Sequence, residues 1–161
     1  MRSLLTSTNI CSPLSSNVRG KSEEVRTKFE EVRTMIFEKK NTIIEEKVMD
    51  FAVKVVKLKK RLNSQKHEYN ISDQLQRSGS AIGALYGEAH FAESDADFVH
   101  KLRIALKECH ESLYWIELLY KTEYLPEEEC KELYDNCVEL RRMLTSSVNT
   151  VNRRLEQTKR S

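Results

Sequence analysis

Apolar side chains recur every three or four residues along most of the chain, a spacing that gathers them on one face of an α-helix. The pattern predicts four long helices: residues 42–63, residues 73–92, a third that follows Ser94, and a fourth that begins at Pro126. Short connections between helices make consecutive helices antiparallel. The sequence therefore predicts an all-α protein, an antiparallel up-and-down four-helix bundle.

The start of each predicted helix carries a residue that can bind free backbone N–H groups or that suits a first helical turn. Three starts have a serine or a threonine, and in two of them an acid follows three residues later, as in a capping box. The fourth has a proline and then three glutamates, which favour the positive end of the helix dipole. These residues are Thr42 with Glu45, Ser72, Ser94 with Asp97, and Pro126 with Glu127, Glu128 and Glu129.

Three of the predicted helices carry apolar stripes that we expect to meet in a common core. In residues 42–63 the stripe is Val48, Phe51 or Ala52, Val55, Leu58 and Leu62. After Ser94 it is Phe98, Leu102, Ala105, Cys109, Ser112 or Leu113, Ile116 and Leu119. After Pro126 it is Cys130, Leu133, Cys137, Leu140, Leu144, Val148, Val151 and Leu155.

The chain divides into three parts by composition. Residues 1–20 are rich in Ser, Thr and Asn and are interpreted as a disordered leader. Residues 21–41 form an accessory amphipathic helix or an extension of the first bundle helix, and residues 42–158 form the bundle domain. The amphipathic positions of the middle part are Val25, Phe29, Val32 and Ile36.

Composition excludes several classes of protein. No apolar run approaches the roughly 20 residues of a membrane span, so we expect no membrane partner. The four cysteines include no C-x-x-C pair, which argues against a zinc or redox motif. Three of them, Cys109, Cys130 and Cys137, lie on apolar stripes and are expected to be buried, reduced thiols. This favours a reducing, cytoplasmic location.

The formal net charge of the chain is only +2, so any argument for a polyanionic partner depends on local charge. Residues 53–66 contain six cations and no acid, and residues after 140 contain six cations against one acid. Such clusters can bind the phosphates of nucleic acid, or they can be solvated cations near helix C-termini, where the dipole favours them. The candidate nucleic-acid-binding residues are Lys54, Lys57, Lys59, Lys60, Arg61, Arg141, Arg142, Arg153 and Arg154.

Three glycines, Gly79, Gly83 and Gly87, stand four residues apart in the second predicted helix and share one face. A glycine inside a helix costs up to about 1 kcal/mol relative to alanine, so this stripe needs a compensating contact. Close packing against another helix of the same bundle is the simpler interpretation. A subunit contact or a ligand groove is the alternative.

Catalytic chemistry finds little support. Asp97 and His100 have the spacing of a di-iron ligand pair, but no second pair accompanies them. His110 and Glu111 begin a zinc-protease pattern, but Tyr114 stands where its second histidine belongs. We therefore expect no enzymatic activity, no catalytic residue, no metal and no cofactor.

For the aromatic residues around the last predicted turn, core packing or a subunit contact is favoured over base stacking. These are Tyr114, Trp115, Tyr120, Tyr124 and Tyr134.

Three runs of the sequence together resemble a known family. They are residues 74–89 (QLQRSGSAIGALYGEA), residues 92–109 (AESDADFVHKLRIALKEC) and residues 114–119 (YWIELL). This combination resembles the bacterial four-helix-bundle proteins encoded in intervening sequences of 23S ribosomal RNA genes. The chain departs from the family pattern at Ala81 and Leu85, where serine and asparagine are common, and its second helix is correspondingly more apolar.

The resemblance implies an antiparallel four-helix bundle that assembles into a ring-like homopentamer and has no enzymatic activity. It also implies kinship with the accessory variability protein of diversity-generating retroelements, which binds nucleic acid and a reverse transcriptase. Together with the basic clusters, this predicts a self-associating bundle that binds RNA, DNA or a ribonucleoprotein partner, such as a reverse transcriptase. The alternative is a protein-interaction scaffold with no role in nucleic-acid binding.

Overall fold

The computed structural model describes residues 43–160, and the side chains as far as residue 157. The first helix spans residues 43–61 and continues into a π-helical turn, η1 (Leu62–Lys66). The helices α2 (Asn70–Ala89), α3 (Asp95–Lys121) and α4 (Glu127–Arg160) follow. Within the described residues no strand occurs, and the predicted all-α class is confirmed. The predicted leader (1–20), the accessory helix (21–41), Cys11 and the Thr42 cap lie outside the described residues.

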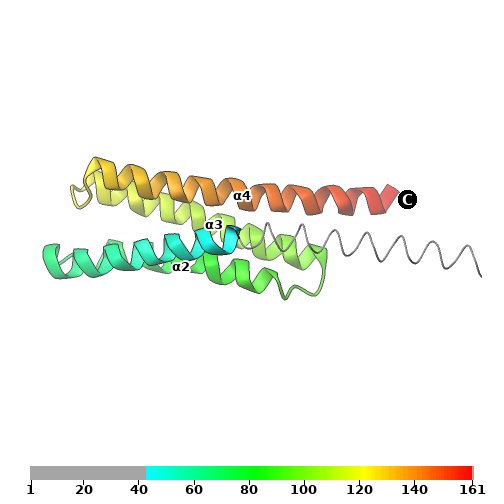
Figure 1. Cartoon of the computed structure of the whole chain (residues 1–161), viewed down its shortest axis with the longest axis horizontal. Helices are drawn as coiled ribbons and strands as arrows, with labels where there is room; N and C mark the ends of the chain where they lie inside the picture. The colour runs from blue at the N-terminus through cyan, green and yellow to red at the C-terminus, as the bar shows by residue number, and fades with distance from the viewer. Residues whose placement is uncertain (1–42, 161) are drawn as a thin grey trace, which may run out of the picture. The chain divides into compact units, whose positions relative to one another are not determined.

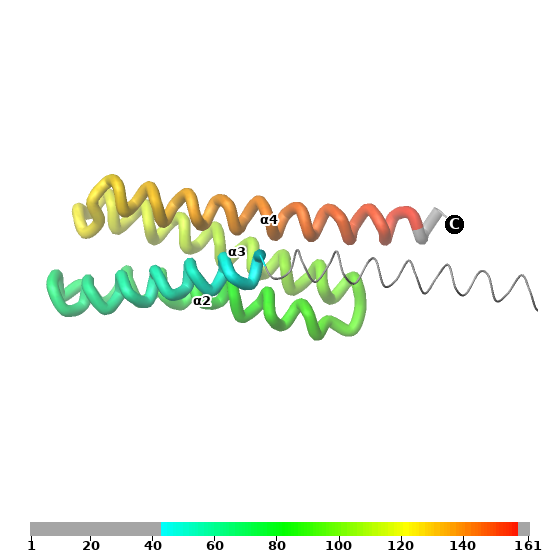
Figure 2. The backbone as a smooth tube through the Cα atoms, viewed as in Figure 1, coloured from blue at the N-terminus to red at the C-terminus, as the bar shows by residue number. Residues whose placement is uncertain are grey.

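The four helices run side by side, and each lies antiparallel to the next (Figure 1). The first helix borders both α2 and α4, because its lysines pair with Asp73 of α2 and with Glu132 and Glu139 of α4. The antiparallel up-and-down bundle predicted from the sequence is therefore confirmed. α4 is the longest helix, and its C-terminal end reaches past the connection between α2 and α3 (Figure 2).

The predicted apolar stripes form one continuous core. Phe51 of the first helix is buried and Ala52 is only half-buried, which settles the alternative left open by the periodicity. On α3 the helix buries both Ser112 and Leu113. On α4 the stripe is buried from Leu133 to Val151, while its two ends, Cys130 and Leu155, are half-buried. The buried apolar faces thus account for the association of the helices.

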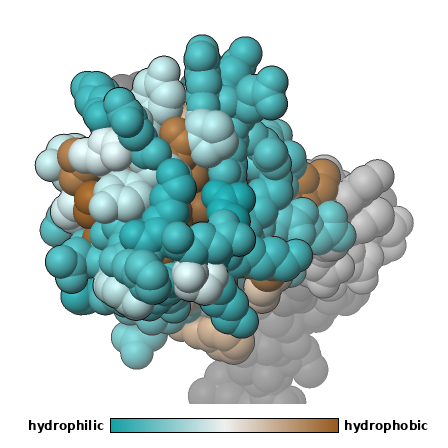
Figure 3. Space-filling model, turned by 90° about the vertical axis from the view of Figure 1, so that its left-hand side faces the viewer, coloured by the Kyte–Doolittle hydropathy of each residue, from teal (hydrophilic) through white to brown (hydrophobic). Residues whose placement is uncertain are grey.

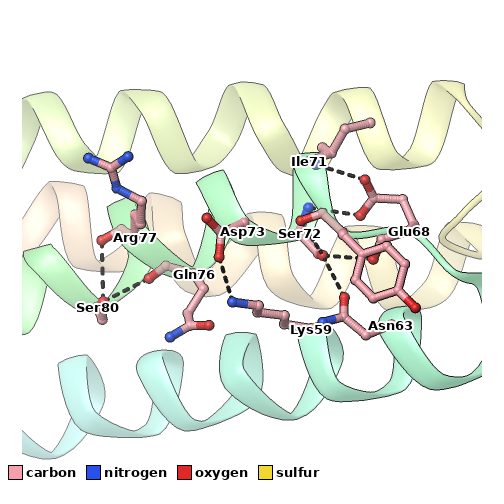
Figure 4. A network of polar contacts seen from close by, with 10 residues as sticks. Lys59, Asn63, Glu68, Ile71, Ser72, Asp73, Gln76, Arg77 and Ser80 are labelled. Carbon is pink, nitrogen blue, oxygen red and sulfur yellow. Dashed lines mark hydrogen bonds and ion pairs between the residues drawn. The ribbon is translucent and has the colours of Figure 1, made fainter.

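The start of α2 differs from the prediction, because the helix begins at Asn70 and Ser72 lies inside its first turn. The cap is Glu68, a buried residue whose Oε1 accepts from the Ile71 N–H at 2.7 Å and whose Oε2 accepts from the Ser72 N–H at 2.9 Å (Figure 4). His67, just before it, has φ 50° and turns the chain back after η1. Of the residues between the first two predicted helices, 64–66 belong to η1 and 70–72 to α2, and only residues 67–69 are not helical.

The starts of α3 and α4 lie close to their predicted positions. The Ser94 side chain accepts from the Asp97 N–H at 3.1 Å, as its capping spacing predicts. α4 begins at Glu127, with Pro126 immediately before it; the Pro126 carbonyl accepts from the Cys130 N–H. The three glutamates of the first turn stand at the positive end of the α4 dipole. None of the helices within residues 43–160 is long and apolar enough to span a bilayer.

Candidate nucleic-acid interface

The basic side chains of the first helix are largely paired within the bundle. Lys54 Nζ lies 2.6 Å from Glu132 Oε1, and Arg61 binds Glu129 at the same distance. Lys59 pairs with Asp73 of α2. Each of these pairs neutralises a cation that the sequence offers to a polyanion. Three of the five predicted residues on this helix are therefore already engaged.

Lys57 and Lys60 are the exposed remainder of this cluster, and within the described residues no ion pair involves either of them. Lys57 borders a groove of about 280 Å³ between the first helix and α4. The groove also holds Glu129 and Glu132, whose carboxylates lie beside the cations. A phosphate chain that entered it would meet both signs of charge, so this groove is a weak candidate for polyanion binding.

The outward side of α4 has a different character. From Leu140 to Leu155 the helix carries four arginines and no acid. Within the described residues no ion pair joins Arg141, Arg142 or Arg153 to a carboxylate. These three arginines line a groove of about 350 Å³ together with four small polar residues. We name this surface the arginine face; it consists of Arg141, Arg142, Thr145, Ser146, Asn149, Thr150 and Arg153.

The arginine face has the donor chemistry that phosphate oxygens require. Guanidinium groups bind phosphate with two parallel N–H donors, and serine, threonine and asparagine side chains add further contacts. Thr145 and Thr150 donate their hydroxyl hydrogens to backbone carbonyls of the preceding turn, at 2.7 and 2.8 Å, so within the described residues the donors of this face that remain for a phosphate are the arginines, Ser146 and Asn149. Arg154 is also exposed and follows Arg153 directly. The face can therefore follow a sugar–phosphate backbone along the helix.

The two predicted basic clusters do not form one site. The Lys54–Glu132 pair fixes the register between the first helix and α4. Arg153 lies 21 residues beyond Glu132 on α4, which corresponds to about 32 Å along the helix axis. The candidate residues of the first helix and the far end of the arginine face consequently lie in different halves of the bundle.

Two exposed cations of α3 were not predicted as candidate site residues, Arg103 and Lys107. The Cys137 thiol donates to the Cys109 carbonyl, at 3.4 Å, and this contact sets the register between α3 and α4. Because the helices are antiparallel, Lys107 and Arg103 lie level with residues 139–143, where the arginine face begins. Their i, i+4 spacing outside the apolar stripe of α3 is a signal that sequence inspection could have used.

Comparison with known proteins now identifies the family. Residues 40–146 match the family model described as 23S rRNA-intervening sequence protein. The chain belongs to this family. A crystal structure of a protein with unknown function from the S23 ribosomal protein family, from Bacteroides thetaiotaomicron VPI-5482, has a TM-score of 0.67 and 41% sequence identity. The match covers 68% of this chain and 98% of that one.

No curated protein matches the chain. The resemblance inferred from the sequence is confirmed by the match to the 23S rRNA-intervening sequence protein family. Neither the family model nor the Bacteroides structure carries the name of an enzymatic activity. Membership of the family therefore agrees with the observed fold but does not identify a ligand. The surface of the bundle is the remaining source of evidence on the ligand.

The glycine stripe of this family member has one close contact and one open position. A Cβ built on Gly79 would lie 3.3 Å from a Val55 methyl group and 3.4 Å from Phe51, both on the first helix. At Gly83 the nearest atom is a Val48 methyl at 3.6 Å, an ordinary contact. At Gly87 a Cβ would meet nothing within 4 Å. Packing within the bundle therefore explains Gly79 and leaves Gly87 unexplained.

Two of the residues considered for metal binding, Asp97 and Glu111, have other contacts. Within residues 43–160 no group of three or more His, Cys, Asp or Glu side chains could hold a metal ion. Asp97 accepts from the Glu93 N–H at 3.4 Å, and Glu111 accepts from the indole N–H of Trp115.

The Cys109, Cys130 and Cys137 thiols are free; Cys109 and Cys137 are fully buried, and Cys130 is half-buried. A hydrogen bond to Cys109, together with burial, raises the pKa of the Cys137 thiol.

Proposed function

We propose that this member of the 23S rRNA-intervening sequence protein family binds nucleic acid, or a ribonucleoprotein, through the arginine face of α4. The observation that supports this most is the absence of acids from Leu140 to Leu155, beside three arginines that have no ion-pair partner within the described residues. A polyanion on this surface meets donors without like-charge repulsion. Binding is non-enzymatic, needs no cofactor and takes place in the cytoplasm, where free thiols persist.

The test is a gel-shift titration with structured RNA and with duplex DNA at two salt concentrations. The double variant Arg142→Ala/Arg153→Ala removes two charges from the arginine face. Each lost phosphate contact lowers the slope of log affinity against log salt by about 0.9 for duplex DNA, so we expect a decrease of roughly 1.8. Affinity at low salt falls accordingly.

A matched variant separates the arginine face from overall charge. Lys54→Ala/Arg61→Ala also removes two cations, but both are paired with glutamates in the parent. We expect this variant to keep most of its affinity and its salt dependence. Equal losses in both variants, or no loss in the arginine variant, would overturn the proposal.

A second candidate function is a self-associating scaffold for proteins, with no nucleic-acid role. It is supported by the open position at Gly87 and by two exposed apolar side chains of the neighbouring first helix, Met49 (64% exposed) and Val53 (41%). Exposed apolar side chains of this kind are common in subunit contacts. The family resemblance implies five copies in a ring, and a reverse transcriptase as partner.

Light scattering coupled to size-exclusion chromatography distinguishes the two candidates. Met49→Lys/Val53→Lys is expected to dissociate an assembly that uses this face. Asp135→Lys, at an exposed position of α4 outside the proposed contacts, makes the same change in net charge and serves as the control. Co-purification with a reverse transcriptase at high salt, without any salt-dependent binding of RNA or DNA, favours the scaffold.

A further inference from the structure

A cavity of about 560 Å³ lies at the start of α2, beside the end of the first helix and Trp115 of α3. Its volume falls within the range typical of small-molecule sites. Figure 3 shows the end of the bundle at which η1 is connected to α2. Hydrophilic side chains cover most of this end, with small apolar patches between them. The residues that line the cavity are Lys59, Asn63, Tyr69, Asn70, Ile71, Asp73, Gln74 and Trp115.

The charged groups in the wall of this cavity neutralise each other. Lys59 Nζ binds Asp73 Oδ1 at 2.5 Å (Figure 4), and this pairing lowers the pKa of the Asp73 carboxyl. Two of the N–H groups at the start of α2 are also occupied, because the carboxylate of Glu68 accepts from Ile71 and Ser72. A phosphate therefore finds a paired cation and a helix start whose Ile71 and Ser72 N–H groups already have an acceptor.

The polar groups that remain are amides. Within the described residues no hydrogen bond involves the side-chain amide of Asn70 or Gln74, which stand four residues apart on α2. Each amide offers one acceptor and two donors, the pairing that reads the donor and acceptor edge of a purine base. Asn63 differs from them, because its side chain is bound to Ser72.

Two aromatic side chains complete the wall. Tyr69 is 53% exposed, and the half-buried Trp115 has its indole N–H bound to Glu111 at 3.2 Å. Trp115 therefore offers its π-surface and no further donor to a ligand. Exposed aromatic rings of this kind stack on nucleobases in proteins that bind single strands.

We propose that this cavity binds a nucleobase, which stacks on Tyr69 or Trp115 and exchanges hydrogen bonds with the amides of Asn70 and Gln74. From the sequence, core packing or a subunit contact was favoured over base stacking for Trp115. The structure adds the neighbours of Trp115 around the cavity, which come from the first helix and from α2. The proposal does not rest on the arginine face: the cavity recognises a neutral ring, and the arginine face recognises phosphate.

Trp115 is the single tryptophan of the chain, so intrinsic fluorescence reports on the cavity directly. The full chain is titrated with adenosine, which has a base and no phosphate, and with ribose 5-phosphate, which has a phosphate and no base. We expect a saturable change in emission with adenosine and none with ribose 5-phosphate. Equilibrium dialysis with labelled adenosine gives the affinity independently of fluorescence.

Gln74→Leu and Asn70→Leu remove the amides one at a time, and each is expected to weaken adenosine binding tenfold or more. Gln76→Leu, on the same helix but outside the cavity lining, is the matched control and retains the parent affinity. Far-UV circular dichroism shows whether each variant folds. If Gln74→Leu unfolds, the test depends on Asn70→Leu, because position 70 is exposed.

Three results would overturn the proposal: no saturable response to adenosine, an equal response to ribose 5-phosphate, or parent affinity in the folded Asn70→Leu variant. The Arg142→Ala/Arg153→Ala variant keeps the two proposals separate. Its affinity for adenosine stays unchanged, even where its affinity for RNA or DNA is lost.

Discussion

Lys54 of the first helix and Glu132 of α4 form an ion pair across the surface of the bundle, with 2.6 Å between Lys54 Nζ and Glu132 Oε1. Lys47 and Arg61, seven residues to either side, pair with Glu139 and Glu129 in the same row. Exposed pairs of this kind contribute about 0–1 kcal/mol each to stability. Their larger effect is to neutralise three cations that would otherwise attract a polyanion.

Removing the acids should therefore expose the cations. In Glu129→Gln/Glu132→Gln, Lys54 and Arg61 lose their partners while the shape of the surface is kept. We expect tighter binding of RNA and DNA, and a salt slope steeper by up to about 0.9 for each new phosphate contact. Gel shifts at several salt concentrations measure both quantities.

The control for this variant is Glu46→Gln/Asp50→Gln, which removes two exposed acids on the outer side of the first helix. It produces the same change in net charge, and within the described residues neither acid is paired with a cation. If both variants bind equally tightly, net charge alone governs the affinity and the ion pairs have no specific effect.

Two of the three glycines of α2, Gly87 and Gly79, should respond differently to alanine. At Gly87 the added methyl group meets nothing within 4 Å, so the monomer gains the helix propensity of alanine, up to about 1 kcal/mol. At Gly79 the methyl lies 3.3 Å from Val55 in the buried core, and the strain offsets most of that gain. Gly79→Val overfills the same site and costs about 1–3 kcal/mol.

Urea unfolding of the three variants checks this order. A stabilisation by Gly79→Ala as large as that by Gly87→Ala would show that the first helix gives way easily. Light scattering on Gly87→Ala adds a second result: a methyl group that stabilises the monomer but weakens assembly would place Gly87 in a subunit contact.

The Glu68 cap is a third target. Glu68→Ala leaves the N–H groups of Ile71 and Ser72 without their acceptors at a buried helix start, so we expect a loss of about 1–2 kcal/mol. Glu46→Ala, at an exposed position of the first helix, should change stability by no more than about 0.5 kcal/mol. Hydrogen exchange of the Ile71 and Ser72 amides should also accelerate in Glu68→Ala, and unchanged protection there would refute the capping role.

Glu68 also shows where prediction from the sequence ends. Spacing of apolar residues was sufficient for the four helices and for most of the core, because burial of a helix face leaves its period in the sequence. The start of α2 was misplaced because serine is a preferred cap and glutamate is not. Only the left-handed turn at His67 brings the Glu68 carboxylate to the Ile71 and Ser72 N–H groups.

The candidate site was predicted in part for a similar reason. The basic clusters are visible in the sequence, but Lys54 and Glu132 are 78 residues apart, and their pairing depends on the register between two helices. Periodicity does not give that register. The arginine face could be predicted better, since its lack of acids is a property of one continuous segment.

The Lys59–Asp73 pair makes a prediction about pH. Its hydrogen bond and charge lower the pKa of Asp73 below its usual value of 3.8. The unfolded chain then binds a proton more readily than the folded chain, so the contribution of Asp73 to stability is present above pH 3.8 and is lost as pH falls through the lower, folded pKa. We expect Asp73→Asn to lose stability relative to the parent at neutral pH and to approach the parent in strong acid. Urea unfolding from pH 7 to pH 2 measures this difference. In Lys59→Met the partner of Asp73 is absent, so adding Asp73→Asn to that variant should no longer produce the pH-dependent difference. A difference between Asp73→Asn and the parent that stays constant with pH would contradict the role of the pair.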